Sequence, residues 1–148
     1  MWKWLKRLMI LAILLAIAAV VYGFFMPARI GPVAVHSVSG TGLGYNVRFQ
    51  NHGDDKVVDI RFTVIGYDKN GKTTFNTDCY FDGYLHAKSV TDTNRSWCAF
   101  EYSSKTKSVR VVFRSYTYID SVTQKKITVN VDKNDLNYLL NWKKYPVD

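Results

Sequence analysis

A run of 19 residues without a charged or strongly polar side chain, LMILAILLAIAAVVYGFFM, extends from Leu8 to Met26. At about 1.5 Å per residue a helix of this length measures about 28 Å, close to the roughly 30 Å hydrocarbon core of a bilayer. A helix satisfies its own backbone hydrogen bonds, so it can cross lipid as a single element. The sequence therefore predicts a cytoplasmic stub and a transmembrane anchor over residues 1–29.

Basic residues flank the apolar run unequally. Lys3, Lys6 and Arg7 precede the run, and Arg29 is the only basic residue close behind it. By the positive-inside rule, this asymmetry keeps the N-terminus in the cytoplasm and exports the residues that follow the run. We therefore expect a single-pass membrane protein that carries its domain outside the cytoplasm.

A cleaved signal peptide is the alternative to an anchor. Ala16-Ile17-Ala18 forms an A-x-A site after a short apolar stretch, which is the pattern that signal peptidases cleave. Cleavage after Ala18 would leave eight apolar residues at the start of the mature chain and expose them to water. We favour the uncleaved anchor for this reason, and a domain released by cleavage stays the second interpretation.

Small residues recur along the anchor at spacings of four, three and four, which places them on one helix face: Ala12, Ala16, Ala19 and Gly23. Small side chains let helix backbones approach closely, and in lipid this packing is a main source of association. The stripe predicts a seam for a second transmembrane helix, from a copy of this chain or from another protein. Alanine is also common in anchors, so a stripe without a packing role stays open.

The residues after Met26 are mildly basic and contain both cysteines. They hold all 12 acidic residues and 17 of the 20 Lys and Arg residues, a net charge of +5 (17 − 12). The absence of a basic run or a recognition motif speaks against a nucleic-acid partner. Cys79 and Cys98 match no metal-ligand spacing, and an exported domain most simply pairs two cysteines. A loop of about 20 residues closed in this way adds about 3 kcal/mol of stability; two buried free thiols are the alternative.

Apolar and polar residues alternate with a period of two through much of the chain beyond residue 30. In one segment Val58, Ile60, Phe62 and Val64 are separated by single residues, which is typical of a strand with one buried face. The sequence Asp68-Lys69-Asn70-Gly71 then predicts a hairpin turn. We expect a seven-stranded immunoglobulin-like β-sandwich over residues 30–131. Its strands are expected at 30–39, 45–51, 57–67, 73–81, 95–102, 108–118 and 126–131.

A short C-terminal helix and tail are expected over residues 132–148. Asp132 can cap the helix, and Leu136, Leu139 and Leu140 share one of its faces. A lone apolar stripe is usually part of a core. We therefore expect these leucines to cover an open end of the sandwich.

The middle of the chain also carries a recognisable pattern. The asparagine-ended segment Tyr45 to Asn51 precedes a strand and YD-x-x-G hairpin at Ile60 to Gly71, and Asp82-Gly83-Tyr84-Leu85, Trp97 and Val109 to Phe113 follow. On this pattern residues 33–122 resemble the small immunoglobulin- or fibronectin-like domains of bacterial envelope proteins, of the FxLYD kind. The resemblance implies an anchor in the bacterial cytoplasmic membrane and a domain in the periplasm or the extracellular space.

The sequence offers no arrangement typical of catalysis. His36, His52 and His86 are far apart with no ligand spacing, and no HExxH, GxSxG or phosphate-binding loop is present. Glu101 is the only glutamate, and most aspartates fall in predicted turns. We therefore expect no enzymatic activity, no cofactor and no bound metal.

A binding surface is expected where segments 57–67, 108–118 and 126–131 share a sheet. The predicted outward residues are Arg61, Arg110, Arg114, Tyr116, Tyr118 and Lys126, together with Asp59 and Val112. Arginine and tyrosine are enriched at protein interfaces. The alternative is a solvated face on which Asp59 neutralises nearby arginines. The sequence thus predicts a non-enzymatic protein that binds or scaffolds envelope proteins, or itself through the anchor. A secreted or anchored module for a small or polymeric ligand is the alternative, and a hydrolase is a third.

Overall fold

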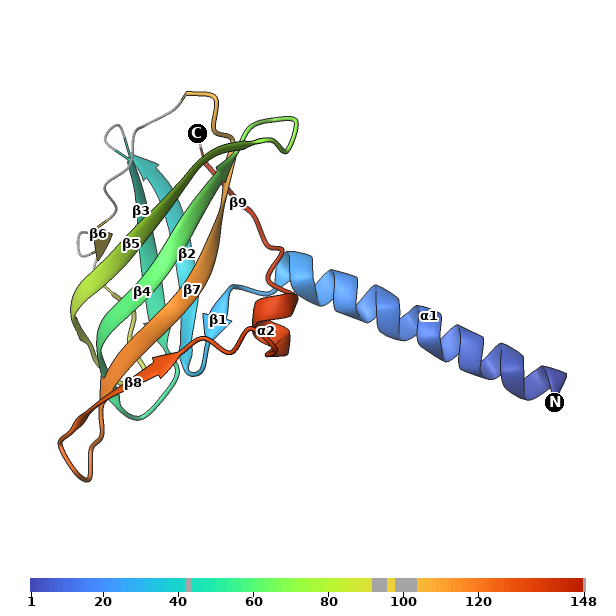
Figure 1. Cartoon of the computed structure of the whole chain (residues 1–148), viewed down its shortest axis with the longest axis horizontal. Helices are drawn as coiled ribbons and strands as arrows, with labels where there is room; N and C mark the ends of the chain where they lie inside the picture. Colours follow the sequence, from blue (N-terminus) through green and yellow to red (C-terminus); the bar gives the residue numbers. More distant parts are fainter. Residues whose placement is uncertain (42–43, 92–95, 98–103, 148) are drawn as a thin grey trace.

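One long helix extends away from the rest of the molecule (Figure 1). The computed structural model describes residues 1–41, 44–91, 96–97 and 104–147, and within them helix α1 covers Trp2–Phe25. By length and composition α1 is able to cross a membrane. The helix ends at Phe25 because Met26 has extended backbone, the conformation favoured for a residue that precedes a proline.

The remaining described residues form two antiparallel sheets and one short helix. The first sheet has the order β1-β2-β3, and the second has the order β6-β5-β4-β7-β8, with β9 also paired to β7. The elements of the first sheet are β1 (Arg29–Ile30), β2 (Val33–Thr41) and β3 (Gly44–Asn51). Those of the second are β4 (Lys56–Tyr67), β5 (Thr73–Leu85), β6 (Ser96–Trp97), β7 (Ser108–Ile119), β8 (Lys126–Asn130) and β9 (Tyr145–Pro146), and α2 is Leu136–Leu139.

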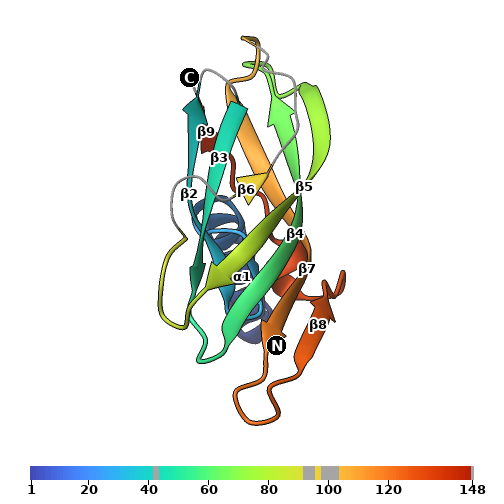
Figure 2. The same ribbon diagram turned by 90° about the vertical axis from the view of Figure 1, so that its left-hand side faces the viewer.

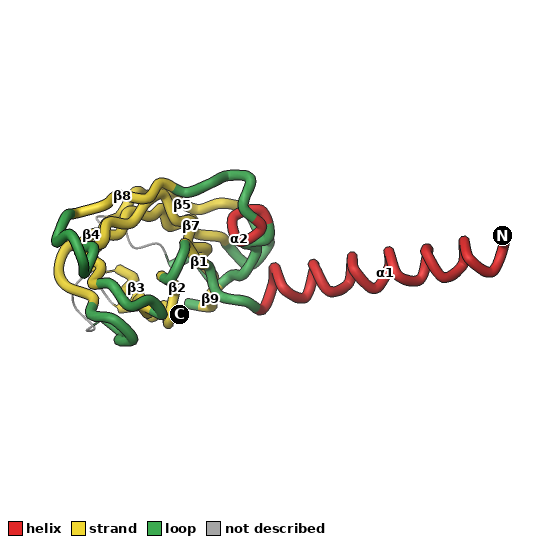
Figure 3. The backbone as a smooth tube through the Cα atoms, turned by 90° about the horizontal axis from the view of Figure 1, so that it is seen from below, coloured by secondary structure: helices red, strands yellow, loops and turns green. Residues whose placement is uncertain are grey.

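The hydrophobic core lies between the two sheets. Figures 2 and 3 show β2 and β3 in one layer and β4, β5 and β7 in the other. Phe49 of β3 is fully buried, and its ring centroid is 4.9 Å from that of Phe62 and 5.6 Å from that of Phe113. The predicted architecture is confirmed at this level: an apolar N-terminal helix, a mainly β domain of two sheets and a short C-terminal helix.

The alternation of β4 follows the prediction except at its start. Ile60, Phe62 and Val64 are buried as expected, but Val57 is fully buried in place of Val58. A register shift between Val57 and Asp59 causes the difference. One extra residue in a strand moves every side chain before it to the other face.

The hairpin between β4 and β5 is confirmed. The backbone N–H of Asp68 donates to the carbonyl of Lys72, and Gly71 has a φ of 80°. The Asp68 carboxylate accepts the N–H groups of Asn70 and Lys72. The hydrogen bond from Lys72 is the main reason that the pKa of this carboxyl lies below its usual value.

Several strand boundaries differ from the prediction. The first expected strand is two strands, β1 and β2, because Gly31 turns the chain with a φ of 51°. β5 continues past Phe81 to Leu85. Of the expected strand 95–102, residues 96–97 form β6, which pairs with Tyr80 and Phe81, and the other positions lie outside the described residues. β9 adds a pairing at the β7 edge that the sequence did not predict.

The C-terminal helix is shorter than predicted and differently placed. α2 is four residues long, and its cap is Asp135, whose carboxylate accepts the N–H of Asn137. Asp132 instead accepts the N–H of Asn134 in the preceding turn. Leu136 and Leu139 are exposed, so the expectation that they cover the core was wrong.

Candidate functional site

The predicted arginine–tyrosine face does not exist as one surface, because a bulge in β7 divides it. Arg61 of β4 pairs with Ser115, but the next residue, Phe62, pairs with Phe113, so Arg114 has no partner in β4. The bulge moves the residues after it to the opposite face. In β7 the buried residues therefore alternate regularly up to Phe113, and after the bulge Tyr116 is buried instead of Ser115.

The two tyrosines beyond the bulge belong to the core side. Tyr116 is 7% exposed and is a member of the core cluster, and Tyr118 packs against that cluster. Their rings stack at 5.9 Å. Burial raises the pKa of Tyr116. The prediction that Tyr116 and Tyr118 lie outward beside the arginines is thus corrected.

The arginines of β7 also differ from one another. Arg110 lines a cavity of about 220 Å³ together with Leu139 and Trp142, so the C-terminal segment lies beside it. Arg114 forms an ion pair with Asp78 of β5 at 3.0 Å. The outward position of Arg114 is as predicted, but Arg110 does not lie on open sheet surface.

A shallow pocket occupies the other end of this outer face. It has a volume of about 380 Å³, and we call it the sheet pocket. Its walls come from four strands: Asp59, Arg61 and Val58 of β4, Tyr80, Asp82, Gly83 and Tyr84 of β5, Thr117 and Ile119 of β7, and Lys126 of β8. Three of the predicted outward residues, Asp59, Arg61 and Lys126, are therefore brought together here.

Aromatic and charged groups alternate around the sheet pocket. The Arg61 Nε donates to the Asp59 carboxylate at 3.1 Å, and the Arg61 guanidinium lies 5.2 Å from the centre of the Tyr80 ring. Lys56 lies 4.8 Å from the centre of the Tyr84 ring. Tyr84 is 61% exposed and Tyr80 is 41% exposed. The pocket thus presents two accessible rings with charges of both signs.

Sequence reasoning missed the contribution of β5 to this pocket. Tyr80 and Tyr84 face outward because Cys79, Phe81 and Leu85 are buried on the other side of β5. The alternation that places them was readable in the sequence, but the predicted strand ended at Phe81. A strand continued to Leu85 would have placed Tyr84 on the outer face.

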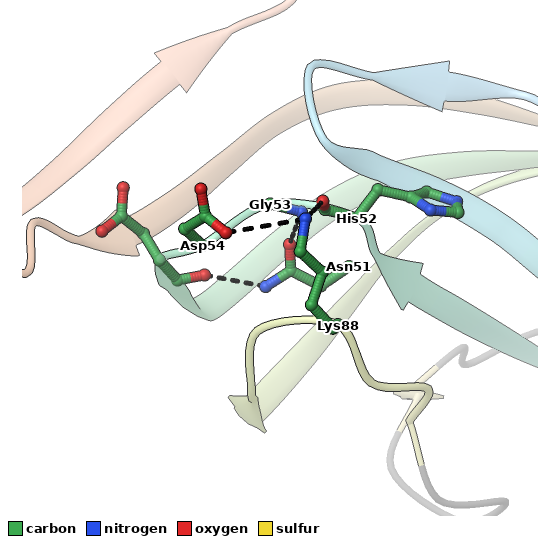
Figure 4. A network of polar contacts seen from close by, with 6 residues as sticks. Asn51, His52, Gly53, Asp54 and Lys88 are labelled. Atoms are coloured by element: carbon green, nitrogen blue, oxygen red, sulfur yellow. Dashed lines mark hydrogen bonds and ion pairs between the residues drawn. The ribbon is translucent and has the colours of Figure 1, made fainter.

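A second polar cluster joins the β3–β4 turn to the loop after β5 (Figure 4). Asn51 is fully buried; its Nδ2 donates to the carbonyls of Asp55 at 2.8 Å and Leu85 at 3.3 Å. Its Oδ1 accepts the N–H of Gly53 at 2.9 Å. Lys88 donates to the carbonyl of His52. The side-chain bonds of Asn51 all go to backbone groups, so we assign this cluster to the fold.

The predicted cysteine pair is described only in part. Cys79 is buried on β5, and Cys98 lies outside the described residues. Trp97, which precedes Cys98 in the sequence, pairs with Tyr80, which follows Cys79. The pairing of Cys79 with Cys98 stays a prediction.

The predicted anchor seam is partly occupied by the chain itself. Gly23 is buried against Trp142 and Leu140, and Ala19 lines a groove with Leu136 and Leu140. Ala12 and Ala16 are exposed on α1. Half of the stripe therefore packs against the C-terminal segment, and the other half remains available to a second helix.

The chain matches no family model, no curated protein and no solved structure. Among the residues that the structure describes, no three His, Cys, Asp or Glu side chains are grouped as metal ligands. The sheet pocket is therefore the candidate site, and its chemistry has to be inferred from its own residues.

Proposed function

We propose that this chain is a single-pass membrane protein whose exported domain binds a segment of another envelope protein at the sheet pocket. The observation that carries the proposal is the pair of exposed tyrosines, Tyr80 and Tyr84, set beside Arg61. Tyrosine and arginine supply large contact areas and hydrogen-bonding tips, and they dominate binding energy at protein interfaces.

The position of the pocket supports the same proposal. The hairpin between β7 and β8 lies at the end of the sheet away from α1 (Figure 1), and Ile119 and Lys126, on either side of this hairpin, line the pocket. If α1 crosses the membrane, the pocket lies at the end of the sheet that is remote from the lipid. A partner in the envelope space could then reach it without displacing the anchor.

We further propose that the two sheets form an immunoglobulin-like sandwich. The strand order β5-β4-β7-β8, with β2 and β3 in the other sheet, supports this because such sandwiches place non-consecutive strands side by side through Greek-key connections. The resemblance to FxLYD-type domains and the location in a bacterial cytoplasmic membrane belong to the same proposal. The free part of the seam, Ala12 and Ala16, is proposed as the contact for a second transmembrane helix.

Site-directed photocrosslinking in cells that make the full chain tests the binding site. A photoreactive residue replaces Tyr84, and a matched control replaces Ser39, which is exposed on β2 of the other sheet. We expect crosslinked products from position 84 that are absent from position 39. The double substitution Arg61→Ser and Tyr80→Ser should abolish them, whereas Arg114→Ser, an exposed arginine outside the pocket, should not. Equal crosslinking from both positions, or crosslinking insensitive to the double substitution, would contradict the proposal.

A ligand-binding module is the second candidate, because the pocket volume of about 380 Å³ is within the range of small-molecule sites. The Tyr80 and Tyr84 rings could stack on a sugar ring while Asp59 and Asp82 accept its hydroxyl groups. Mass spectrometry of the products crosslinked at position 84 separates the candidates. Attached peptides support the protein partner, and attached saccharides support the ligand.

A further inference from the structure

The C-terminal segment is fastened to the end of α1. The backbone N–H of Trp142 donates to the carbonyl of Gly23 at 3.1 Å, and the Tyr22 hydroxyl donates to Asn137 Oδ1 at 2.6 Å. The rings of Phe24 and Trp142 are 5.9 Å apart. A Cβ on Gly23 would lie 2.5 Å from Trp142 Cε3 and 2.8 Å from the Leu140 carbonyl oxygen. Only glycine allows this contact without a shift of the backbone.

These contacts fall within the apolar run of α1, not beyond it. Gly23 lies three residues before Met26, the end of the run, which is about 4.5 Å along the helix axis. Ala19, which lines a groove with Leu136 and Leu140, lies about 10 Å before the end. A bilayer that covers the apolar run therefore reaches the level of the C-terminal segment.

The same segment leaves large apolar side chains partly or mostly exposed among the residues that the structure describes. Leu136 is 69% exposed, Leu139 is 52% exposed and Trp142 is 36% exposed. In water this cluster would be unfavourable, but at a membrane surface leucine enters the acyl boundary and tryptophan prefers the headgroup level.

Positive charge lies beside these side chains. Arg110 lines a small cavity with Leu139 and Trp142, and Lys143 follows Trp142 directly in the sequence. Cations next to an apolar patch complement the anionic headgroups of a leaflet. Asp135 lies beside Leu136 in the groove with Ala19, so the charges here are of both signs, and depth and exposed apolar area are the observations that indicate lipid.

We propose that α2 and Trp142 form a second membrane contact, in which Leu136, Leu139 and Trp142 enter the outer leaflet beside α1. The proposal rests on the proposed anchoring by α1, since that helix sets the depth. The domain then has two attachments to the lipid, one spanning and one at the surface. Two attachments fix its tilt and hold the sheet pocket at a distance from the bilayer.

Depth-dependent fluorescence quenching tests the contact on the full chain. Trp2, Trp4, Trp97 and Trp142 are replaced by phenylalanine, and the chain is reconstituted into phosphatidylcholine–phosphatidylglycerol vesicles with bromine at defined acyl positions. One tryptophan is then introduced at a time. Leu139→Trp reports on the proposed contact, Leu14→Trp reports on the middle of α1, and Val122→Trp is the control. Val122 is 89% exposed in the hairpin before β8.

The three reporters give distinct results. We expect Leu139→Trp to be quenched most strongly by bromine near the headgroup end of the chains, Leu14→Trp by bromine near their middle, and Val122→Trp by neither. An unquenched Leu139→Trp beside a quenched Leu14→Trp would overturn the surface contact and leave the anchor standing. If Leu14→Trp is also unquenched, the proposed membrane anchoring by α1 is refuted, and the proposed surface contact is refuted with it.

Discussion

Replacing Asn51 by alanine should destabilise the domain more than any surface substitution of the same kind. The Asn51 amide is fully buried and makes three side-chain hydrogen bonds, to the backbone of Gly53, Asp55 and Leu85. Alanine removes all three bonds and leaves an N–H and two carbonyls without these partners. A cavity of amide size also remains in the core.

The size of the stability loss follows from these three hydrogen bonds. Each net hydrogen bond contributes about 1 kcal/mol, and a buried group left without a partner costs at least as much. The loss for Asn51→Ala is therefore about 3 kcal/mol, a large share of the 5–15 kcal/mol typical of a domain. With a urea m-value of about 1.5 kcal/mol/M, the unfolding midpoint should fall by about 2 M.

Urea unfolding of the full chain in detergent micelles, followed by near-ultraviolet circular dichroism, measures this change. Asn76→Ala is the matched control, because Asn76 is exposed on the outer face of β5, and it should change stability by less than about 0.5 kcal/mol. A loss below about 1 kcal/mol for Asn51→Ala, or an equal loss for both variants, would refute the assignment of this network to the fold.

The aspartate variant tests the direction of the hydrogen bonds. Asn51→Asp keeps an acceptor for Gly53 but sets a carboxylate against the carbonyls of Asp55 and Leu85. Burial beside two acceptors should raise the pKa of the introduced carboxyl above its ordinary value of about 3.9. The variant should therefore lose stability as pH rises above about 4. A variant equally stable at pH 4 and pH 7 would contradict this geometry.

Three further predictions concern an exposed ion pair, a buried phenol and the cysteines. Arg114→Ala breaks the ion pair between Arg114 and Asp78, whose side chains are 56% and 67% exposed. Urea unfolding should therefore show a loss of stability below about 1 kcal/mol, and this loss should shrink in high salt. Burial raises the pKa of Tyr145 to about 12. The stability that the folded protein gains from the protonated phenol is therefore complete below pH 10 and is lost as pH rises through 12. Between pH 9 and 11 the free energy of unfolding of the native chain should fall by about 1.4 kcal/mol more than that of Tyr145→Phe. An equal pH dependence of unfolding in the two proteins would refute this. Thiol labelling of the unfolded, unreduced chain should find neither Cys79 nor Cys98 free, and reduction should cost about 3 kcal/mol; labelling before reduction would exclude the bridge.

Local patterns in the sequence predicted the helix, most of the strands and the hairpin. The apolar run predicts α1 because a helix satisfies its own backbone hydrogen bonds over so many consecutive apolar residues, and the alternation around Phe62 predicts β4. The turn at Asp68 to Gly71 is predictable because its hydrogen bonds are made within five residues. Each of these elements is determined by neighbours in the chain.

The candidate site was predictable only in part, because long-range pairing decides it. Nothing local in the sequence marks Arg114 as a bulge; the bulge is defined by the register of β7 against β4. The burial of Tyr116 and Tyr118 follows from that register. Likewise, the stripe that contains Gly23 predicted a contact on one helix face but not its occupant, Trp142, which is distant in the sequence.

The hydrogen bond between Ala28 and Tyr145 joins positions 117 residues apart. Ala28, Ile30, Tyr145 and Val147 all belong to the same core cluster. During synthesis, Ala28 and Ile30 can therefore complete their core contacts only after nearly all of the β-domain has left the ribosome. A chain broken before Tyr145 would leave Ala28 and Ile30 without part of the apolar surface that covers them in the complete core.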